Sequence, residues 1–260
     1  MTSTDDLRGN LEQAERLVRE AAGRGAQLVC LPENFAFLRR EGLPVPCAQD
    51  LDGEIISTLR RVARECAIWI LGGTFPEAIE GDTRTHNTSV LLTCDGAIAA
   101  VYRKLHLFDV DLRERGGGAF RESDAVAPGK DVVVAETPFG VIGLSICYDL
   151  RFPELYRAHA ERGARWLAVP SAFAVPTGKD HWEVLLRARA IENQAFVLAP
   201  AQYGRHNPDR ESYGRSLVVD PWGTILAQAP DRPCALVVDC DLDAQDGTRA
   251  SLPVLAHRRL

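Results

Sequence analysis

The chain has 260 residues, of which 46% are apolar and 25% are charged, and its formal net charge at pH 7 is −6. This ordinary globular composition excludes disorder, collagen-like repeats and low complexity. A mildly acidic chain lacks the basic footprint of a nucleic-acid-binding protein, which excludes that class of partner. No apolar run approaches the roughly 18 residues of a membrane span, and residues 1–20 are too polar for a signal peptide. We therefore expect a cytoplasmic protein that does not contact membranes.

The cysteines are seven in number and are scattered along the whole chain. They form no CxxC pair and no Cys/His cluster with zinc spacing, so we expect no metal site. An odd count without a disulfide framework is typical of a reducing compartment with free thiols. This pattern leaves open whether any one thiol is chemically active.

Apolar residues in the first half of the chain alternate between helical and strand spacing. They predict a helix over 7–22, a strand over 26–32, a helix over 54–66, a strand over 67–75 and a hairpin of 88–93 with 97–103. Gly23 and Gly25 end the first helix, and Asp95-Gly96 is a typical two-residue hairpin turn. This half therefore alternates helices and strands.

The second half repeats that order. It predicts strands over 139–147, 164–173, 194–202 and 234–242, helices over 153–163 and 181–193, and a hairpin over 215–228. Two copies of one strand–helix pattern predict two sheets packed face to face with helices outside. We expect an α/β protein, a four-layer α-β-β-α sandwich, in a single domain over residues 1–260.

The two copies differ at their beginning. The second copy opens with a strand, whereas the first begins with the polar residues 1–6 and enters its helix directly. One buried apolar side chain contributes about 1.5–3 kcal/mol, and a whole domain is stable by only about 5–15 kcal/mol. We therefore expect the first strand to be missing, and we hypothesise a late-assigned start codon or a shortened chain.

Reactive residue types stand where three predicted strands end. Cys147 closes the strand over 139–147, Glu33 follows the strand over 26–32, and Lys104 follows the hairpin. A nucleophile on a sharp strand-to-helix turn projects its side chain, while nearby N–H groups stabilise an oxyanion. A carboxylate among apolar groups is suited to act as a base, and Glu122 is placed to orient the lysine.

Each of these residues also has an ordinary structural interpretation. Free cysteine is among the most buried residue types, so Cys147 taken alone is more often a packed thiol. Glu33 and Glu122 alone would be solvated loop acids, and Lys104 would be a surface lysine. The chemical interpretation depends on finding them together.

Together they match a family pattern. Residues 31–37 (LPENFAF), 102–109 (YRKLHLFD) and 143–157 (GLSICYDLRFPELYR) resemble the three catalytic signatures of the nitrilase superfamily, in order and at similar spacing. The resemblance continues through 181–202 and 213–223 to LPVLAHRR at 252–259. On these motifs the chain is identified as a member of that superfamily.

The resemblance implies a Glu–Lys–Cys triad that hydrolyses non-peptide C–N bonds through a thioester. Cys147 would attack the amide carbonyl, and Glu33 would accept its proton, protonate the leaving group and activate water. Lys104 and the backbone N–H of Tyr148 would stabilise the oxyanion, and Glu122 would hold Lys104 and the substrate amide. No metal or organic cofactor is implied, and the partners are a small-molecule amide and water.

Small differences in short sequence motifs indicate the branch within the superfamily. Residues 170–173 (PSAF), Thr177-Gly178 and 220–223 (DPWG) resemble the branch that acts on glutathione whose amino group has become a keto group, a metabolite-repair amidase. The alternative is the ω-amidase branch, which acts on 2-oxoglutaramate and 2-oxosuccinamate. Both readings imply a substrate that carries a carboxylate.

Several residues are candidates for contacts with the substrate. Within PSAF, Ser171 and Phe173 are expected at the binding site. A carboxylate needs a binding group, and the candidates for it are Arg151, Arg113, Arg115 and Thr177, although Arg151 is equally suited to an ion pair with Asp149 or Glu154.

The resemblance also implies a homodimer that packs through the helix over 153–163, with Leu155, Tyr156 and His159 as contacts. Two other interpretations stay open. One is a non-catalytic dimeric binding protein on the same fold, which would be expected to lack a triad member. The other is a redox sensor with a low-pKa thiolate at Cys147. The loop between Lys104 and Glu122 contains three consecutive glycines, which indicate mobility beside the pocket.

Overall fold

The computed structural model describes residues 1–43 and 45–259. Its α-helices are α1 (Leu7–Gly23), α2 (Glu54–Cys66), α3 (Pro153–Glu161), α4 (Val175–Asn193) and α5 (Leu242–Ser251). Short 3-10 helices are η1 (Arg113–Arg115), η2 (Glu122–Asp124) and η3 (Cys147–Arg151). The helices predicted over 7–22, 54–66 and 153–163 are confirmed. The fourth begins at Val175 rather than residue 181, because Pro176 suits the first turn of a helix.

The first sheet contains strands from the first half of the chain. They are β1 (Leu28–Cys30), β2 (Trp69–Leu71), β3 (Phe75–Ala78), β4 (Thr85–Leu92) and β5 (Ile98–Arg103). The order is β1-β2-β4-β3, with β5 paired to β4, and only β1 and β2 are parallel. The predicted hairpin around Asp95-Gly96 joins β4 to β5, and Gly96 adopts the positive φ of 80° that such a turn requires.

The second sheet is built from the second half. Its strands are β8 (Val134–Ala135), β9 (Ile142–Leu144), β10 (Trp166–Ala168), β11 (Phe196–Ala199), β14 (Leu217–Val219) and β15 (Ile225–Gln228), in the order β15-β14-β11-β10-β9-β8. Two separate ribbons pair β6 (Asp109–Asp111) with β7 (Ala119–Arg121), and β12 (Tyr203–Asn207) with β13 (Arg210–Tyr213). Neither ribbon was predicted, since their polar residues show no periodic pattern.

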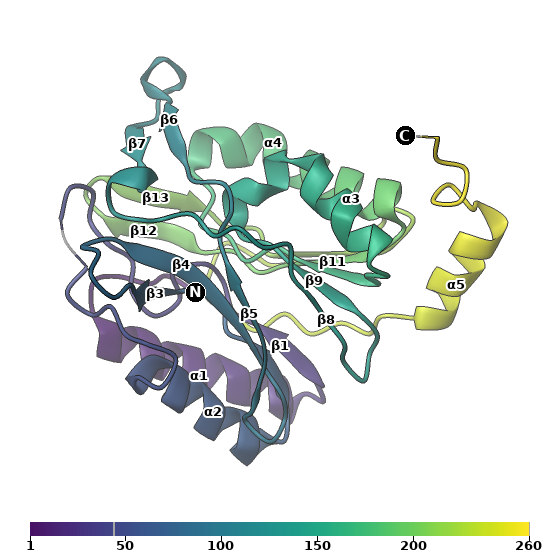
Figure 1. Ribbon diagram of the computed structural model, residues 1–260, viewed down its shortest axis with the longest axis horizontal. Helices are drawn as coiled ribbons and strands as arrows, with labels where there is room; N and C mark the ends of the chain where they lie inside the picture. The colour runs from purple at the N-terminus through teal and green to yellow at the C-terminus, as the bar shows by residue number, and fades with distance from the viewer. Residues whose placement is uncertain (44, 260) are drawn as a thin grey trace.

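The layers follow the order predicted from the repeat (Figure 1). Helices α1 and α2 cover the outer face of the first sheet, and α3 and α4 cover the outer face of the second. One apolar cluster lies between α1, α2 and the first sheet, with Val18, Ile56 and Ile70 fully buried. A second cluster joins both sheets with α3 and α4 and contains Tyr102 and Leu144. The four-layer α/β sandwich is confirmed.

Among the described residues, one edge of the first sheet has no pairing strand. Residues 1–6 form no strand, as predicted, and β1 is the terminal strand of its sheet. All residues of β1 are only half-buried, whereas those of β10 are fully buried. A cavity of about 380 Å³ lies along this edge, lined by Met1, β1 and residues 234–240 among others.

The strand predicted over 234–242 is wrong. Residues 234–241 are extended but form no strand, and α5 begins at Leu242. They line the same cavity as β1, and no strand among the described residues pairs with them, so the apolar alternation that predicted a strand is not matched by a partner strand.

Three residues proposed for a dimer contact lie inside the chain. Leu155, Tyr156 and His159 are 4%, 0% and 0% exposed. The hydroxyl group of Tyr156 hydrogen-bonds the Ser145 hydroxyl at 2.8 Å. Their assignment to a dimer interface is therefore wrong, because these side chains already pack in the chain's own core.

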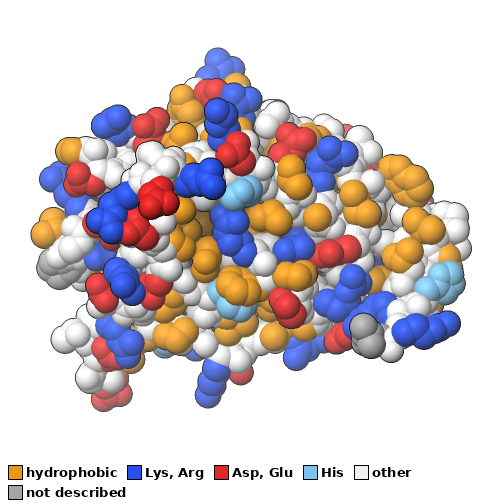
Figure 2. Space-filling model, turned by 90° about the horizontal axis from the view of Figure 1, so that it is seen from above, with side chains coloured by type: hydrophobic (Ala, Val, Ile, Leu, Met, Phe, Trp, Pro, Cys, Tyr) orange, Lys and Arg blue, Asp and Glu red, His pale blue; other side chains and the backbone are white. Residues whose placement is uncertain are grey.

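The surface shows no segregation of charge on the face in Figure 2, where basic and acidic side chains are interspersed with apolar ones. Among the described residues, none of the helices has the length and apolar character needed to cross a membrane. The seven cysteines are all free thiols.

Candidate active site

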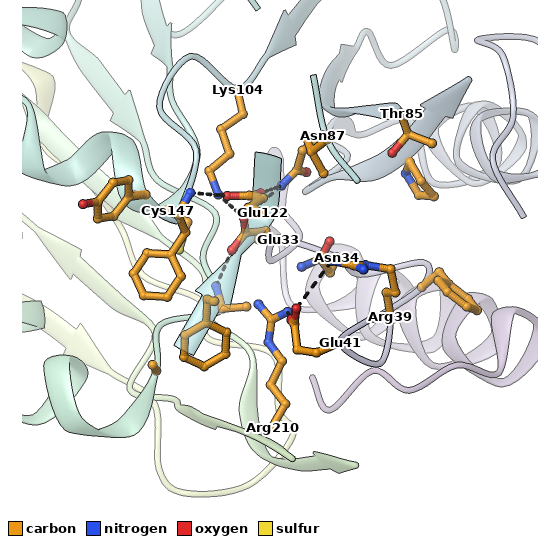
Figure 3. A pocket seen from close by; sticks show the side chains of 18 of the residues that line it. Glu33, Asn34, Arg39, Glu41, Thr85, Asn87, Lys104, Glu122, Cys147 and Arg210 are labelled. Carbon is orange, nitrogen blue, oxygen red and sulfur yellow. Dashed lines mark hydrogen bonds and ion pairs between the residues drawn. The ribbon is translucent and has the colours of Figure 1, made fainter. Parts of the chain in front are cut away.

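Four residues predicted from separate motifs meet in one cavity (Figure 3). Glu33 follows β1, Lys104 follows β5, Cys147 follows β9 as the first residue of η3, and Glu122 is the first residue of η2, directly after the β6–β7 ribbon. All four line a cavity that encloses about 80 Å³. The two sheets supply the first three side chains, and the ribbon adds the fourth.

Cys147 stands on a sharp strand-to-helix turn. Its φ of 47° lies in the left-handed region, which is costly for a residue with a Cβ. The Cys147 N–H donates to the carbonyl of Pro170 at 2.9 Å, which fixes the turn against β10. The N–H of Tyr148 has no carbonyl acceptor among the described residues and is free to bind an oxyanion.

The buried carboxylate of Asp149 stabilises this turn through hydrogen bonds. Its carboxylate is fully buried and accepts hydrogen bonds from the Tyr102 hydroxyl at 2.7 Å and the Ile146 N–H at 2.8 Å. It also faces His106, whose N–H and Nδ1 lie 3.0 and 2.7 Å from Oδ1. The expected ion pair of Asp149 with Arg151 is therefore replaced by this network.

Lys104 is a buried cation between two carboxylates. Its Nζ lies 2.9 Å from Oε1 of Glu33 and 2.9 Å from Oε2 of Glu122, and its side chain is 2% exposed. Burial alone would lower the pKa of this amine, but the negative charges of Glu122 and Glu33 raise it above its ordinary value. Lys104 is therefore charged at neutral pH.

Glu33 contacts both the cation and the nucleophile. Burial raises the pKa of its carboxyl group, and the charge of Lys104 together with the Cys147 thiol lowers it further than burial raises it. Its Oε2 also accepts the N–H of Ala172 at 2.8 Å. An ionised carboxylate against a thiol is the arrangement that general-base catalysis requires.

The Cys147 thiol is protonated in this resting arrangement. Burial raises its pKa and the negative charge of Glu33 raises it further, which together outweigh the opposite effect of Lys104. These surroundings do not favour the low-pKa thiolate that a redox sensor uses. The nucleophile needs a base at the moment of attack, and Glu33 lies beside it.

Asn87 is a site residue that the sequence did not indicate. Its Nδ2 donates to Glu33 at 3.0 Å and to Glu122 at 3.3 Å, so one amide ties both carboxylates together. Glu122 also accepts the N–H of Phe108 at 2.6 Å. Asn87 directly precedes the predicted strand 88–93, and a polar residue at a strand end has no local signal that distinguishes it from a turn residue.

The other predicted contacts divide into two groups. Tyr148, Phe173 and Thr177 line the cavity, and the Thr177 hydroxyl donates to Ala174 at 3.3 Å. Ser171 does not line it, because its hydroxyl donates to the carbonyl of Val169 at 3.0 Å instead.

The arginines predicted to bind a carboxylate do not line the cavity. The guanidinium carbon of Arg151 lies 5.7 Å from the ring centroid of Tyr148 and 5.4 Å from that of Phe173, two residues that do line the cavity. Arg113 pairs with Asp111 beside the exposed end of the β6–β7 ribbon, and Arg115 is exposed there as well. The cavity instead contains Arg39, Glu41 and Arg210, which come from loops and a ribbon without sequence periodicity.

Comparison with known proteins identifies the family of this chain. A profile of the carbon-nitrogen hydrolase family matches residues 1–250. The chain is 45% identical to the deaminated glutathione amidase of Homo sapiens, covering 100% of this chain and 80% of that protein. It is 43% identical to the deaminated glutathione amidase of Synechocystis, covering 99% of this chain and 95% of that protein.

Solved structures give the same result. The C. elegans NitFhit protein superposes with a TM-score of 0.90 at 42% identity; the match covers all of this chain but 63% of that one, less than two thirds of its length. Saccharomyces cerevisiae Nit3, described as a member of branch 10 of the nitrilase superfamily, superposes with a TM-score of 0.84 at 29% identity, covering 100% of this chain and 93% of that one. The chain therefore belongs to the carbon-nitrogen hydrolase family, within the nitrilase superfamily.

Proposed function

We propose that the chain is a cysteine-dependent amidase whose substrate is deaminated glutathione. The observation that carries the reaction class is the meeting of Cys147, Glu33 and Lys104 in one cavity, where Nζ of Lys104 lies 2.9 Å from the Glu33 carboxylate. The substrate is proposed from the relatives that the chain matches along their length at 43–45% identity, which are named deaminated glutathione amidases.

The first half of the reaction forms a thioester. Glu33 removes the thiol proton as Sγ of Cys147 attacks the amide carbonyl, and the oxyanion is held by Nζ of Lys104 and the N–H of Tyr148. The tetrahedral intermediate collapses, the C–N bond breaks, and Glu33 returns the proton to the leaving amine. Glu122 keeps Lys104 oriented and faces the nitrogen that departs.

The second half consumes one water molecule. Glu33, now ionised again, removes a proton from water, which attacks the thioester carbonyl. The C–S bond breaks, the proton passes from Glu33 to the sulfur, and the carboxylic acid leaves. The cycle returns Cys147 to the thiol and Glu33 to the carboxylate, so no cofactor is consumed.

The test compares two amides of the same 2-oxo acid. Deaminated glutathione and 2-oxoglutaramate release the same 2-oxo diacid, which chromatography quantifies, but differ in the amine that leaves. We expect the larger kcat/KM on deaminated glutathione, and the reverse order would assign the chain to the ω-amidase branch. Cys147→Ala should lower the rate by on the order of 10⁴-fold, since the nucleophile's role is not shared. Undiminished turnover in this variant would contradict the thioester mechanism.

We also propose that the chain works as a homodimer in the cytoplasm. The dimer follows from the resemblance to the superfamily, with contacts other than Leu155, Tyr156 and His159. Seven free thiols support a reducing compartment. Sedimentation equilibrium of the purified chain tests the dimer, and a monomer at micromolar concentration would contradict it.

A further inference from the structure

We propose that Arg210 and Arg39 bind a carboxylate of the substrate, and that Glu41 is an internal counter-ion which this carboxylate displaces. The proposal rests on the proposed function, hydrolysis of an amide at Cys147. Beyond that function, it identifies the residues that select a substrate with a carboxylate. These are residues that the sequence did not indicate.

The two arginines reach the cavity from different parts of the fold. Arg39 lies in the loop after β1, and Arg210 is the first residue of β13 in the β12–β13 ribbon. Both line the cavity that contains Cys147, and their side chains are 17% and 21% exposed (Figure 3). They are therefore largely withdrawn from bulk water. A charge-assisted hydrogen bond is stronger in such a partly buried position than in water.

The charges of the cavity are separated into two ends. Around the nucleophile, Glu33 and Glu122 surround Lys104, so that end has an excess of one negative charge. At the other end, Arg39 and Arg210 share the single carboxylate of Glu41, which leaves an excess of one positive charge. A substrate with a neutral amide at one end and a carboxylate at the other complements this arrangement.

Glu41 holds both arginines loosely. Its carboxylate lies 3.5 Å from Arg39 and 3.3 Å from Arg210, with one contact to each. The structural pair of Arg103 with Glu77 differs, because two contacts of 2.6 Å join its guanidinium and carboxylate. A guanidinium offers five N–H donors, so Arg210 keeps unused donors for a second carboxylate.

Arg210 is also electrostatically close to the reacting groups. Burial raises the pKa of the Glu33 carboxyl, and the positive charge of Arg210 is among the causes that lower it, after Lys104 and the Cys147 thiol. Aromatic side chains, those of Phe37, Phe108 and Phe173, line the same cavity. An acyl chain of a few carbons would find these rings to pack against within the cavity.

The test uses two amides of equal chain length, glutaramate with a terminal carboxylate and pentanamide without one, and measures ammonia release. We expect Arg210→Met to lower kcat/KM on glutaramate by about 30-fold or more relative to its effect on pentanamide, as for a lost hydrogen-bonded charge pair. Arg39→Met should act in the same direction. Glu41→Gln should raise kcat/KM on glutaramate several-fold, because the competing carboxylate loses its charge.

Arg205→Met is the matched control. Arg205 lies on the same ribbon, its side chain is 68% exposed, and its partner is Glu211 rather than a cavity residue. Its removal should change neither amide. Equal losses on both amides in Arg210→Met, or an unchanged rate on glutaramate, would overturn the proposal.

A binding measurement separates this proposal from the proposed function. Glutarate is titrated calorimetrically into the unmodified chain and into Arg210→Met, which needs no turnover. Weaker binding to the variant supports the carboxylate site even when neither amide is hydrolysed and the proposed function has failed. Equal affinity for both proteins, or no binding to either, would overturn the carboxylate site.

Discussion

Lys104 keeps its charge inside the protein because two carboxylates surround it. Three hydrogen bonds join its Nζ to Glu33 and Glu122, which is the number of donors an ammonium group has. An isolated buried lysine would lose its proton. The cation that stabilises the oxyanion and the base that activates the thiol therefore depend on each other.

Lys104→Met should lower kcat by at least about 10²-fold, because the variant loses a preorganised oxyanion donor. It also leaves two carboxylates buried without their counter-ion, so we expect a lower urea midpoint in the same protein. Lys179→Met, at an exposed position of α4, is the control and should change neither quantity. A Lys104→Met protein with normal kcat would refute the role assigned to the amine.

Asn87→Asp should move the acid limb of the pH–rate profile. The new carboxylate lies against Glu33 and Glu122, and a like charge raises the pKa of its neighbours. A smaller fraction of the Glu33 carboxyl is then ionised near neutral pH. The acid limb of the kcat/KM profile therefore moves to a higher pH, by about one pH unit or more. Asn87→Leu removes the same amide without a charge. It should lower the rate and shift the limb upward by less than Asn87→Asp does, because only a hydrogen bond to the carboxylate is lost. Equal limbs in the two variants would contradict this account.

At the scale of elements, the turn between β9 and η3 presents the nucleophile. A positive φ at Cys147 is tolerated because the surrounding contacts fix the turn, above all the carboxylate of Asp149. That carboxylate connects the turn to β5 through Tyr102 and to the following loop through His106. The strand that precedes Lys104 and the turn that carries Cys147 are therefore held by one buried acid.

Tyr102→Phe should weaken the connection between β5 and the turn that carries Cys147. The loss of the hydroxyl leaves Asp149 with one donor fewer in a dry interior, at a cost of about 1–3 kcal/mol in the free energy of unfolding. We expect kcat to fall as well, because the turn loses its link to β5. Tyr156→Phe is the comparison, since that hydroxyl bonds Ser145 and not Asp149. Urea unfolding and kcat are measured on both, and an equal kcat in the two variants would argue against a positioning role for Tyr102.

Periodicity predicted most elements but not their lengths. β1, β9 and β10 are each three residues long, shorter than the apolar runs that predicted them, because only part of each run has a hydrogen-bonding neighbour. The extended segment 234–240 shows the same limit, since an apolar pattern does not report whether a partner strand exists. Strand formation depends on the partner as well as on the sequence itself.

The residues of the site likewise fall into those that the sequence indicated and those that it did not. Glu33, Lys104 and Cys147 follow recognisable strands and stand in motifs, so the sequence placed them together. Asn87 and Arg210 could not be predicted, since their partners Glu33 and Glu41 are distant in the sequence and only folding brings them near. Ser171 was predicted from its motif, but its hydroxyl bonds a backbone carbonyl. Residue type indicates chemistry, whereas side-chain direction is set by packing.

At the scale of the whole molecule, two histidines link stability to pH. Burial lowers the pKa of His159 from 6.5 to about 4, and both of its ring nitrogens lack a hydrogen-bond partner among the described residues. Burial likewise lowers the pKa of His206 to about 4, and its ring contacts Ser3 and Ser212. Both rings are therefore neutral in the folded protein at pH 7.

The free energy of unfolding should fall as pH drops from 6.5 to 4. In that window the unfolded chain binds protons at both histidines and the folded chain does not, so their contribution is complete above pH 6.5 and is lost below it. The loss amounts to at most about 3 kcal/mol for each ring. Urea unfolding at pH 7.5 and pH 4.5 measures it. In the double variant His159→Gln and His206→Gln the pH dependence should flatten, and an unchanged slope would place its origin elsewhere.

Among the described residues, β1 pairs with a strand on one side only. A half-buried strand of this kind, next to a cavity of about 380 Å³, is a template on which another chain can extend the sheet. Molecules in concentrated solution should therefore attract one another. Static light scattering would show this attraction as a negative second virial coefficient, and a charged side chain introduced along this edge would turn it positive. Colloidal behaviour, rather than catalysis, is the property that this edge governs.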